Sequence, residues 1–193
     1  VSPTKMEDVV VSTPIDNLHL APATLALAGA NVELVPLDRR EYLLRDNLAA
    51  LLDRYDYIVI DSPPSLGMLT VNGLVAADEI LVPVQSEYYS LEGLGQLIET
   101  IDMVRQYLHP GVRLLGVVLT MYDPQYRLSD AVLTELYRFF PSRQIFRSVI
   151  PRHVRLAEAP SFGQTIIEYD PTSPGAKAYK KLAHEIHRTH PHE

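Results

Sequence analysis

Four segments of this sequence place polar or charged side chains directly after an apolar run, which is where parallel α/β proteins hold their ligands. At the first segment, the run 57–60 leads straight into Asp61 and Ser62. A carboxylate there is costly unless a cation receives it, and in phosphate-binding proteins that cation is commonly hydrated Mg²⁺. Asp61 is therefore a candidate metal-facing acid. The alternative is an Asp that caps the turn after the strand.

The other three segments follow the apolar runs 80–84, 114–120 and 145–150. The first two of these carry polar residues that an ordinary loop would also show. The third carries Arg152 and Arg155, and the planar fork of an arginine suits bidentate binding of phosphate. Loop arginines are also common as solvated residues, so this segment alone is compatible with a phosphate site and with a solvated loop.

The elements that position these segments follow from apolar periodicity. Continuous apolar runs predict strands buried on both faces, at 18–21, 57–60, 80–84, 114–120 and 145–150. Helical spacing of apolar residues predicts helices over 43–52, 91–108 and 132–140, and a last helix that Ser173 caps with Pro174 at its first position. We therefore expect one α/β domain over residues 1–193, with a mostly parallel twisted sheet and helices on both faces.

Composition excludes several classes of protein. The chain has no cysteine, so disulfides, thiolate metal sites and iron–sulfur clusters are impossible. No apolar stretch approaches the roughly 20 residues of a bilayer span, and we expect no membrane partner. The net charge of −7 argues against nucleic-acid binding, yet residues 138–193 hold nine basic and five acidic side chains. Ordinary surface charge and a basic functional end both explain that asymmetry.

Four strings carry a resemblance to a known family. They are YDYIVIDSPPSLG at 55–67, PVQSEYYSLEGL at 83–94, LTMYD at 119–123 and IPRHVRLAEAPSFG at 150–163. In this order and spacing they resemble the ParA/Soj family of chromosome and plasmid partitioning ATPases. The resemblance implies a deviant P-loop NTPase fold (SIMIBI, ParA/MinD-like) that binds ATP and Mg²⁺. It also implies a cytoplasmic, nucleoid-associated homodimer that binds DNA non-specifically and is stimulated by a ParB-type protein.

A Gly-Lys-Ser/Thr string, which would hold the phosphates, occurs nowhere in the 193 residues. In the family that loop precedes the region matched here, so the chain resembles the C-terminal three quarters of a member, without its N-terminal strand, loop and helix. We expect the parent protein to be an ATPase and this chain alone to be inactive. The alternative is a non-hydrolytic DNA- or protein-interaction module on the same scaffold.

The resemblance also implies roles for individual residues. Asp61 corresponds to the acid that holds Mg²⁺ through water. The switch II loop, which senses the terminal phosphate, corresponds to Ser62, Pro63, Pro64 and Gly67. These residues are only part of a catalytic site. The contacts to adenine and ribose correspond to Thr120, Pro151 and Arg152. The expected DNA contacts are Arg155, Arg127 and Arg152, with Gln125 at a position where members carry a further arginine.

A last expectation concerns the strand at 58–60. In the family the strand that bears the phosphate loop lies beside the strand that bears the Mg²⁺-holding acid. Unpaired backbone groups beside an interior strand would cost about 1 to 3 kcal/mol each. We therefore predict that residues 58–60 have a ladder partner on both sides.

Overall fold

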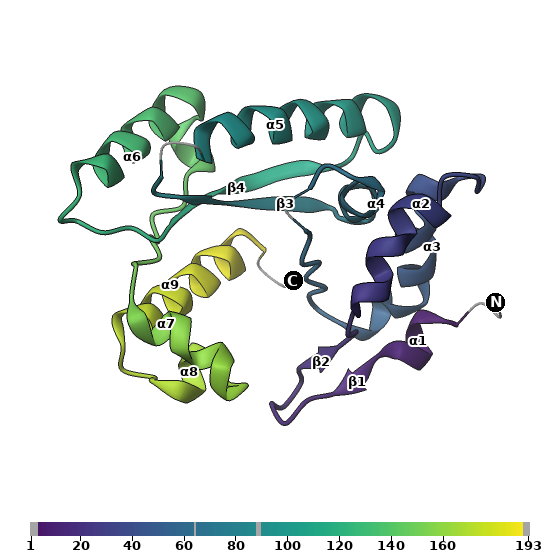
Figure 1. Ribbon diagram of the computed structural model, residues 1–193, viewed down its shortest axis with the longest axis horizontal. Coiled ribbons are helices and arrows are strands. Elements are labelled where there is room, and N and C mark those ends of the chain that lie inside the picture. Colours follow the sequence, from purple (N-terminus) through teal and green to yellow (C-terminus); the bar gives the residue numbers. More distant parts are fainter. Residues whose placement is uncertain (1–3, 64, 88–89, 191–193) are drawn as a thin grey trace. The chain divides into compact units, whose positions relative to one another are not determined.

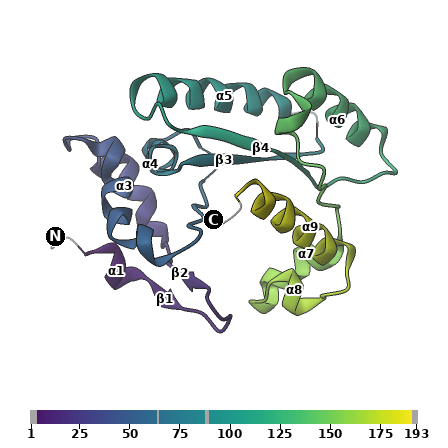
Figure 2. The same ribbon diagram turned by 180° about the vertical axis from the view of Figure 1, so that it is seen from behind.

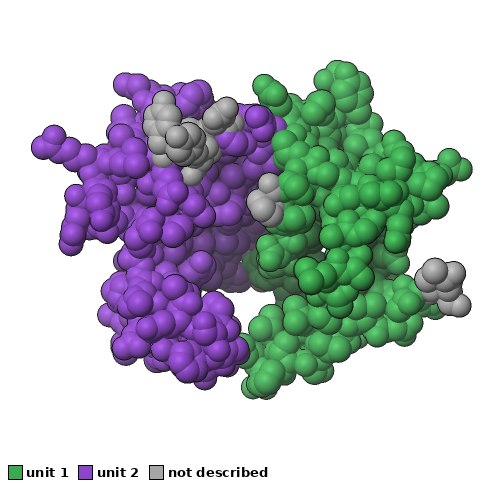
Figure 3. All heavy atoms as spheres, viewed as in Figure 1, with its two compact units in different colours: residues 1–78, 99–112 green, residues 79–98, 113–193 purple. Residues whose placement is uncertain are grey.

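The computed structural model describes residues 4–63, 65–87 and 90–190 (Figure 1). The chain divides into two compact units, coloured separately in Figure 3. Unit 1 comprises residues 1–78 and 99–112, and unit 2 comprises residues 79–98 and 113–193. The single domain expected over 1–193 stays a prediction, and each unit is described by itself.

Unit 1 consists mainly of short helices and one small hairpin. Its elements are α1 (Met6–Val9), β1 (Val11–Ser12), β2 (His19–Leu20), η1 (Leu25–Gly29), α2 (Ala30–Glu33), η2 (Arg40–Tyr42), α3 (Leu43–Leu48), η3 (Ala49–Arg54), α4 (Met68–Ala76) and residues 99–107 of α5 (Ser90–Tyr107). The predicted helix over 43–52 is confirmed as α3 and its 3₁₀ continuation η3. The predicted buried strand at 18–21 is wrong, because β2 pairs antiparallel with β1 alone and both its residues are exposed.

A buried asparagine joins α3 to α4 in unit 1. Asn72 is 4% exposed, and its Oδ1 accepts the backbone N–H of Leu44 at 3.1 Å. Its Nδ2 donates to the carbonyl oxygens of Arg40 at 2.8 Å and Met68 at 3.0 Å. Both ends of the amide are therefore satisfied, which is the condition for burying it. Leu48 of α3 and Leu74 of α4 are also buried.

The prediction of a paired strand at 58–60 is wrong. Residues 57–60 have no regular secondary structure and form no ladder with any described strand. Val59 is 90% exposed and Ile58 37%. An apolar run becomes a strand only beside a second strand that takes up its N–H and C=O groups, and the described residues supply none here.

Unit 2 contains the parallel sheet that positions the candidate site. The predicted strands at 80–84 and 114–120 are confirmed as β3 (Glu79–Gln85) and β4 (Arg113–Thr120). They pair in parallel from Glu79 with Arg113 to Gln85 with Thr120, with a register shift between Ile80 and Leu81. Helix α5 (Ser90–Tyr107) connects them, and its residues 90–98 belong to unit 2.

The predicted strand at 145–150 is an irregular neighbour of β4 rather than a full strand. Parallel bridges join Val117 to Ile145 and Tyr122 to Pro151. In this close approach Gly116 has no room for a side chain, since a Cβ would lie 2.8 Å from the Gln144 carbonyl oxygen. The glycine lets segment 145–150 come close enough for hydrogen bonding to β4.

The remaining elements of unit 2 cover the sheet. They are α6 (Arg127–Phe139), η4 (Ser142–Gln144), α7 (Val154–Glu158), η5 (Ala159–Phe162), α8 (Ile166–Tyr169) and α9 (Pro174–Thr189). Within this unit α6 and the first half of α5 lie on one face of β3 and β4, and α9 lies on the other (Figures 1 and 2). Ala178 and Leu182 of α9 pack against Val118 of β4. As predicted, Ser173 caps α9, accepting the Ala176 N–H at 3.1 Å.

In the described part of the chain, no helix has both the length and the apolar character that a bilayer crossing requires.

Candidate functional site

An open pocket of about 480 Å³ lies at the carboxyl ends of β3 and β4 in unit 2. It is lined by Ser86, Glu87, Met121, Asp123, Tyr126, Leu128, Ser129 and Arg152. The strand ends are held together behind it, because Ser86 donates from its N–H and its hydroxyl to the Thr120 carbonyl oxygen, both at 3.0 Å. Thr120 in turn donates its hydroxyl to the Val84 carbonyl oxygen at 3.3 Å. This volume suits a small organic group.

Met121, the first residue after β4, has a left-handed backbone with φ of 53°. That region is uncommon for a residue with a long side chain and costs about 1 kcal/mol or more. Two hydrogen bonds fix the next residue, since the Tyr122 N–H donates to Ile150 at 3.0 Å and the Tyr122 carbonyl oxygen accepts from Arg152 at 2.8 Å. The backbone beside the pocket is thus held in place by segment 150–152.

Of the three residues expected to contact a nucleotide base and ribose, the structure places one in the pocket. Arg152 lines it and donates from Nη2 to Glu87 Oε1 at 3.0 Å, with both side chains about half exposed. Thr120 lies behind the lining, bonded to Val84 and Ser86. Pro151 lines a different groove, described below. Glu87 and the strained Met121 were missed by sequence reasoning.

The expected metal acid and switch loop belong to unit 1. Asp61, Ser62 and Pro63 are exposed, and Pro64 lies outside the described residues. Gly67 directly precedes α4. A Cβ added at this residue would lie only 2.8 Å from Oδ1 of Asn31. The same Oδ1 accepts the N–H of Leu69 at 3.3 Å, so Asn31 caps α4 from a distant part of the chain. A glycine at 67 permits this approach.

The residues described do not fit a complete Mg²⁺-ATP site. No group of three or more His, Cys, Asp or Glu side chains in the described ranges could hold a metal ion. Asp61 is exposed, and the residues before it form no ladder with any described strand. Mg²⁺ needs six oxygen ligands, most of which come from water and phosphate in such sites. The sequence has no Gly-Lys-Ser/Thr string to position those phosphates.

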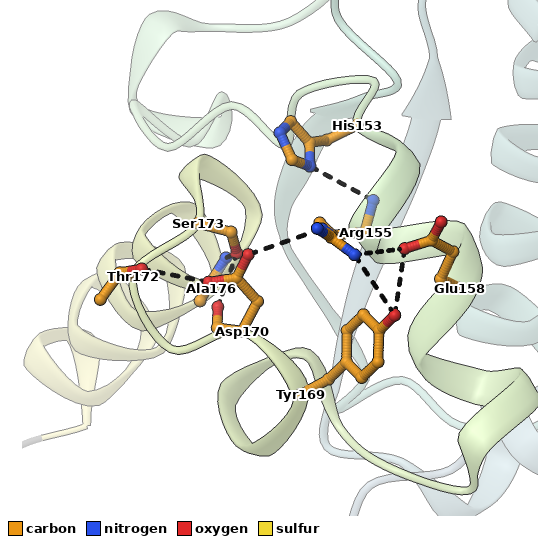
Figure 4. A network of polar contacts seen from close by, with 8 residues as sticks. All are labelled: His153, Arg155, Glu158, Tyr169, Asp170, Thr172, Ser173 and Ala176. Carbon is orange, nitrogen blue, oxygen red and sulfur yellow. Dashed lines mark hydrogen bonds and ion pairs between the residues drawn. The ribbon is translucent and has the colours of Figure 1, made fainter.

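The expected DNA-contacting Arg155 lies in a polar cluster of unit 2 (Figure 4). The Arg155 cluster consists of Arg155, Glu158, Tyr169 and Asp170. Nη1 of Arg155 donates to Glu158 Oε2 at 3.0 Å and to the Tyr169 hydroxyl at 3.5 Å. Its Nε lies 3.8 Å from Asp170 Oδ2, and its guanidinium carbon is 5.8 Å from the centre of the Tyr169 ring. Tyr169 donates its own hydroxyl to Glu158 at 3.1 Å.

The cluster defines the position of the Arg155 guanidinium. Hydrogen bonds to Tyr169 and Glu158, with the charge of Glu158, raise the pKa of Arg155 above its ordinary value. His153 caps α7 by accepting the Arg155 N–H at its Nδ1. Asp170 is held by the Thr172 hydroxyl at 3.1 Å. Backbone and side-chain contacts therefore both define where the guanidinium lies.

The three arginines expected to contact DNA have different surroundings. Arg152 pairs with Glu87, and Arg155 pairs with Glu158 and Asp170. Arg127 is the exposed first residue of α6, and no carboxylate in the described ranges forms an ion pair with it. Gln125 donates its N–H to Asp123 Oδ1 at 2.9 Å.

A row of cations on α9 was missed by sequence reasoning. The α9 cation row, defined as Lys177, Lys181 and Arg188, lines an open groove of about 1,130 Å³ together with Arg147, His184 and Pro151. Among described residues no carboxylate forms an ion pair with the row. The groove's Glu185 already accepts N–H groups of Arg147 at 2.8 Å and Ser148 at 3.0 Å. The spacing of four and seven residues was the signal in the sequence.

Comparison with known proteins adds a family and a fold. A family model described as an AAA domain matches residues 1–114, more than half of the chain. The sporulation initiation inhibitor protein Soj of Bacillus subtilis is 48% identical over 93% of this chain and 70% of its own length. The chromosome partitioning protein ParA of Myxococcus xanthus is 48% identical over 94% of this chain and 64% of its own length.

Among solved structures, cobyrinic acid a,c-diamide synthase from Mycobacterium smegmatis, with bound ADP and magnesium, aligns with a TM-score of 0.81 and 34% identity. The alignment covers 96% of this chain and 68% of that one. The chain thus spans 64 to 70% of the length of these three proteins. The predicted α/β fold of P-loop ATPases, with a parallel sheet, is confirmed.

Proposed function

Since this chain belongs to the ParA/Soj family of partitioning ATPases, we propose that its protein segregates DNA and binds the duplex without sequence preference. The observation that carries this proposal is the α9 cation row. Its three members recur along a single helix and line one groove, and no carboxylate among the described residues forms an ion pair with them.

The geometry of the row suits a nucleic-acid backbone. Lys177 and Arg188 are eleven residues apart, which corresponds to about 16 Å along an α-helix. A duplex presents one phosphate per about 3.4 Å of axis on each strand, so the row can meet several phosphates at once. The Glu185 carboxylate accepts two backbone N–H groups, and these hydrogen bonds weaken its repulsion of DNA phosphates. Contacts of this kind position a protein on DNA without reading its sequence.

In the intact protein, we propose that ATP and Mg²⁺ join two copies into a homodimer that holds DNA at the nucleoid in the cytoplasm. A ParB-type protein would then stimulate hydrolysis and release. Thr120, Pro151 and Arg152 would surround the adenine and ribose at the strand ends, where Arg152 lines the pocket. Asp61 would hold Mg²⁺ through water, and Ser62, Pro63, Pro64 and Gly67 would respond to the terminal phosphate.

A second candidate function is a non-hydrolytic binding module. It is favoured by the location of both the cation row and the strand-end pocket within unit 2. A Gly-Lys-Thr loop encoded directly upstream would favour the ATPase. A foreign sequence there would favour the module.

The DNA proposal is tested with the intact protein, ATP and Mg²⁺, by the fluorescence anisotropy of a short labelled duplex over a range of salt. Lys181→Ala should weaken binding and lower the slope of log affinity against log salt by about 0.9. Lys180→Ala is the matched control, since this neighbouring exposed lysine of α9 lies outside the groove lining. Substituting the whole row should lower the slope by about 2.7. Equal losses in both single variants would contradict a specific phosphate row.

A further inference from the structure

The family resemblance implies that Arg155 contacts DNA, but two carboxylates already lie beside its guanidinium. A guanidinium has five N–H donors. The Glu158 carboxylate and the Tyr169 hydroxyl take those of Nη1, and Asp170 faces Nε. A phosphate can therefore reach the remaining Nη2 edge but cannot engage two edges without displacing a carboxylate.

The net charge of the Arg155 cluster also opposes the binding of a phosphate. One guanidinium and two carboxylates sum to a single negative charge. The side chains of Arg155, Glu158 and Asp170 are 48%, 39% and 30% exposed, so water and salt weaken their field but do not abolish it. A phosphate approaching this surface meets net repulsion, in contrast to one approaching the α9 cation row.

We propose that Glu158 and Asp170 stand in for phosphate at Arg155, so that the DNA backbone must displace them before Arg155 contributes to binding. This inference rests on the proposed DNA function and adds the regulation of one of its contacts. The carboxylates act as competitors of the phosphodiester, and they lower the affinity that an uncovered Arg155 would give. Tyr169 keeps the guanidinium in place through its hydroxyl and ring when a carboxylate is removed.

The test is Glu158→Gln in the intact protein with ATP and Mg²⁺, read by anisotropy of the same duplex. The substitution removes one charge but keeps the size of the side chain and an acceptor oxygen. Removing one negative charge near a bound phosphate should tighten binding about threefold at low salt, and the difference should shrink as salt rises. Asp170→Asn should act in the same direction.

The chain offers a matched control in α6. Arg138 pairs with Glu135 at 2.6 Å with the same three-residue spacing as Arg155 and Glu158, outside both the pocket and the groove. Glu135→Gln changes the net charge of the chain equally and should leave affinity within about 1.5-fold of wild type. Thermal unfolding of each variant verifies that the fold is intact.

A double-mutant cycle separates competition from bulk charge. Arg155→Ala should weaken binding more in the Glu158→Gln, Asp170→Asn background than in wild type, because only there is Arg155 free. If Glu158→Gln binds no better than Glu135→Gln while wild type binds DNA, this inference is overturned and the proposed function stands. If neither wild type nor any variant binds the duplex, the proposed DNA function fails, and this inference fails with it.

Discussion

Two apolar runs of similar composition differ in this molecule, because one forms a paired strand and the other does not. In unit 1, Tyr57-Ile58-Val59-Ile60 precedes Asp61, has no regular secondary structure and forms no ladder with any described strand. In unit 2, Gly116-Val117-Val118-Leu119 precedes Thr120 and lies in the centre of β4. Val59 is 90% exposed, whereas Val117 is fully buried. The difference lies in their neighbours, since β4 has β3 on one side and segment 145–150 on the other.

A residue that follows a strand is held in a defined position only when hydrogen bonds to neighbouring segments fix that strand. Thr120 is held by hydrogen bonds to Val84 and Ser86, and the pocket forms around this fixed point. Asp61 has no such support, because the four residues before it pair with no described strand. A chemically suitable residue therefore makes a site only where the backbone beneath it is fixed.

Hydrogen exchange should give the largest contrast. The amides of β4 are bonded in a buried ladder, whereas those of residues 58–60 have no ladder partner among the described residues. We expect protection factors at least about a thousandfold larger in β4 than at 58–60. Mass-spectrometric or NMR exchange measures both segments in one sample. Comparable protection would mean that another strand, from a second copy or a further segment, pairs with 58–60 in solution.

Matched valine substitutions give the next largest contrast. Val117→Ala removes two buried methyl groups from a position with 0% exposure and should lower the free energy of unfolding by about 2 kcal/mol. Val59→Ala should change it by less than about 0.5 kcal/mol. Urea titration followed by circular dichroism measures both. An equal loss at the two positions would show that Val59 is buried in the solution state.

At the start of β3, a contact between a histidine and a carboxylate makes the stability of unit 2 depend on pH. His190 lies against Glu79, whose Oε1 also pairs with Arg113 at 3.0 Å. The hydrogen bond to the Ile186 carbonyl oxygen and the contact with Glu79 raise the pKa of His190 above its usual 6.5. The stabilisation is complete below the unfolded value of 6.5 and is lost as pH rises through the higher folded value.

We therefore expect unfolding free energy to fall by at most about 1 kcal/mol across that window, since the pair is partly exposed. His190→Ala should remove this dependence, whereas His153→Ala, a cap on α7, should not. Unfolding titrations at several pH values provide the measurement. An increase in stability with pH would contradict the assigned direction.

The smallest effect is expected at Asp61. Because the chain has no loop to hold phosphates, we expect no phosphate release from ATP above a protein-free control, and Asp61→Ala should change nothing. A sensitive phosphate assay with Mg²⁺ present checks both proteins. Release that disappears in Asp61→Ala would mean that Asp61 is supported by partners in solution.

Periodicity and motifs in the sequence predicted much of this molecule. The strands at 80–84 and 114–120 and the last helix with its Ser173 cap were predicted correctly. Local signals decide these features, because β-branched runs, caps and helical stripes act within a few residues. The apolar run at 145–150 also singled out Arg152, the residue two positions after it, and Arg152 lines the strand-end pocket.

Only the tertiary structure decided which runs find partners and which charges are neutralised. The sequence shows an apolar run at 57–60 but does not show that no strand lies beside it. It shows nine basic side chains after residue 137, but not that Arg155 faces Glu158 and Asp170 while Lys181 faces an open groove. Ladder pairing and charge compensation depend on residues far apart in the chain, and their proximity exists only once the chain has folded.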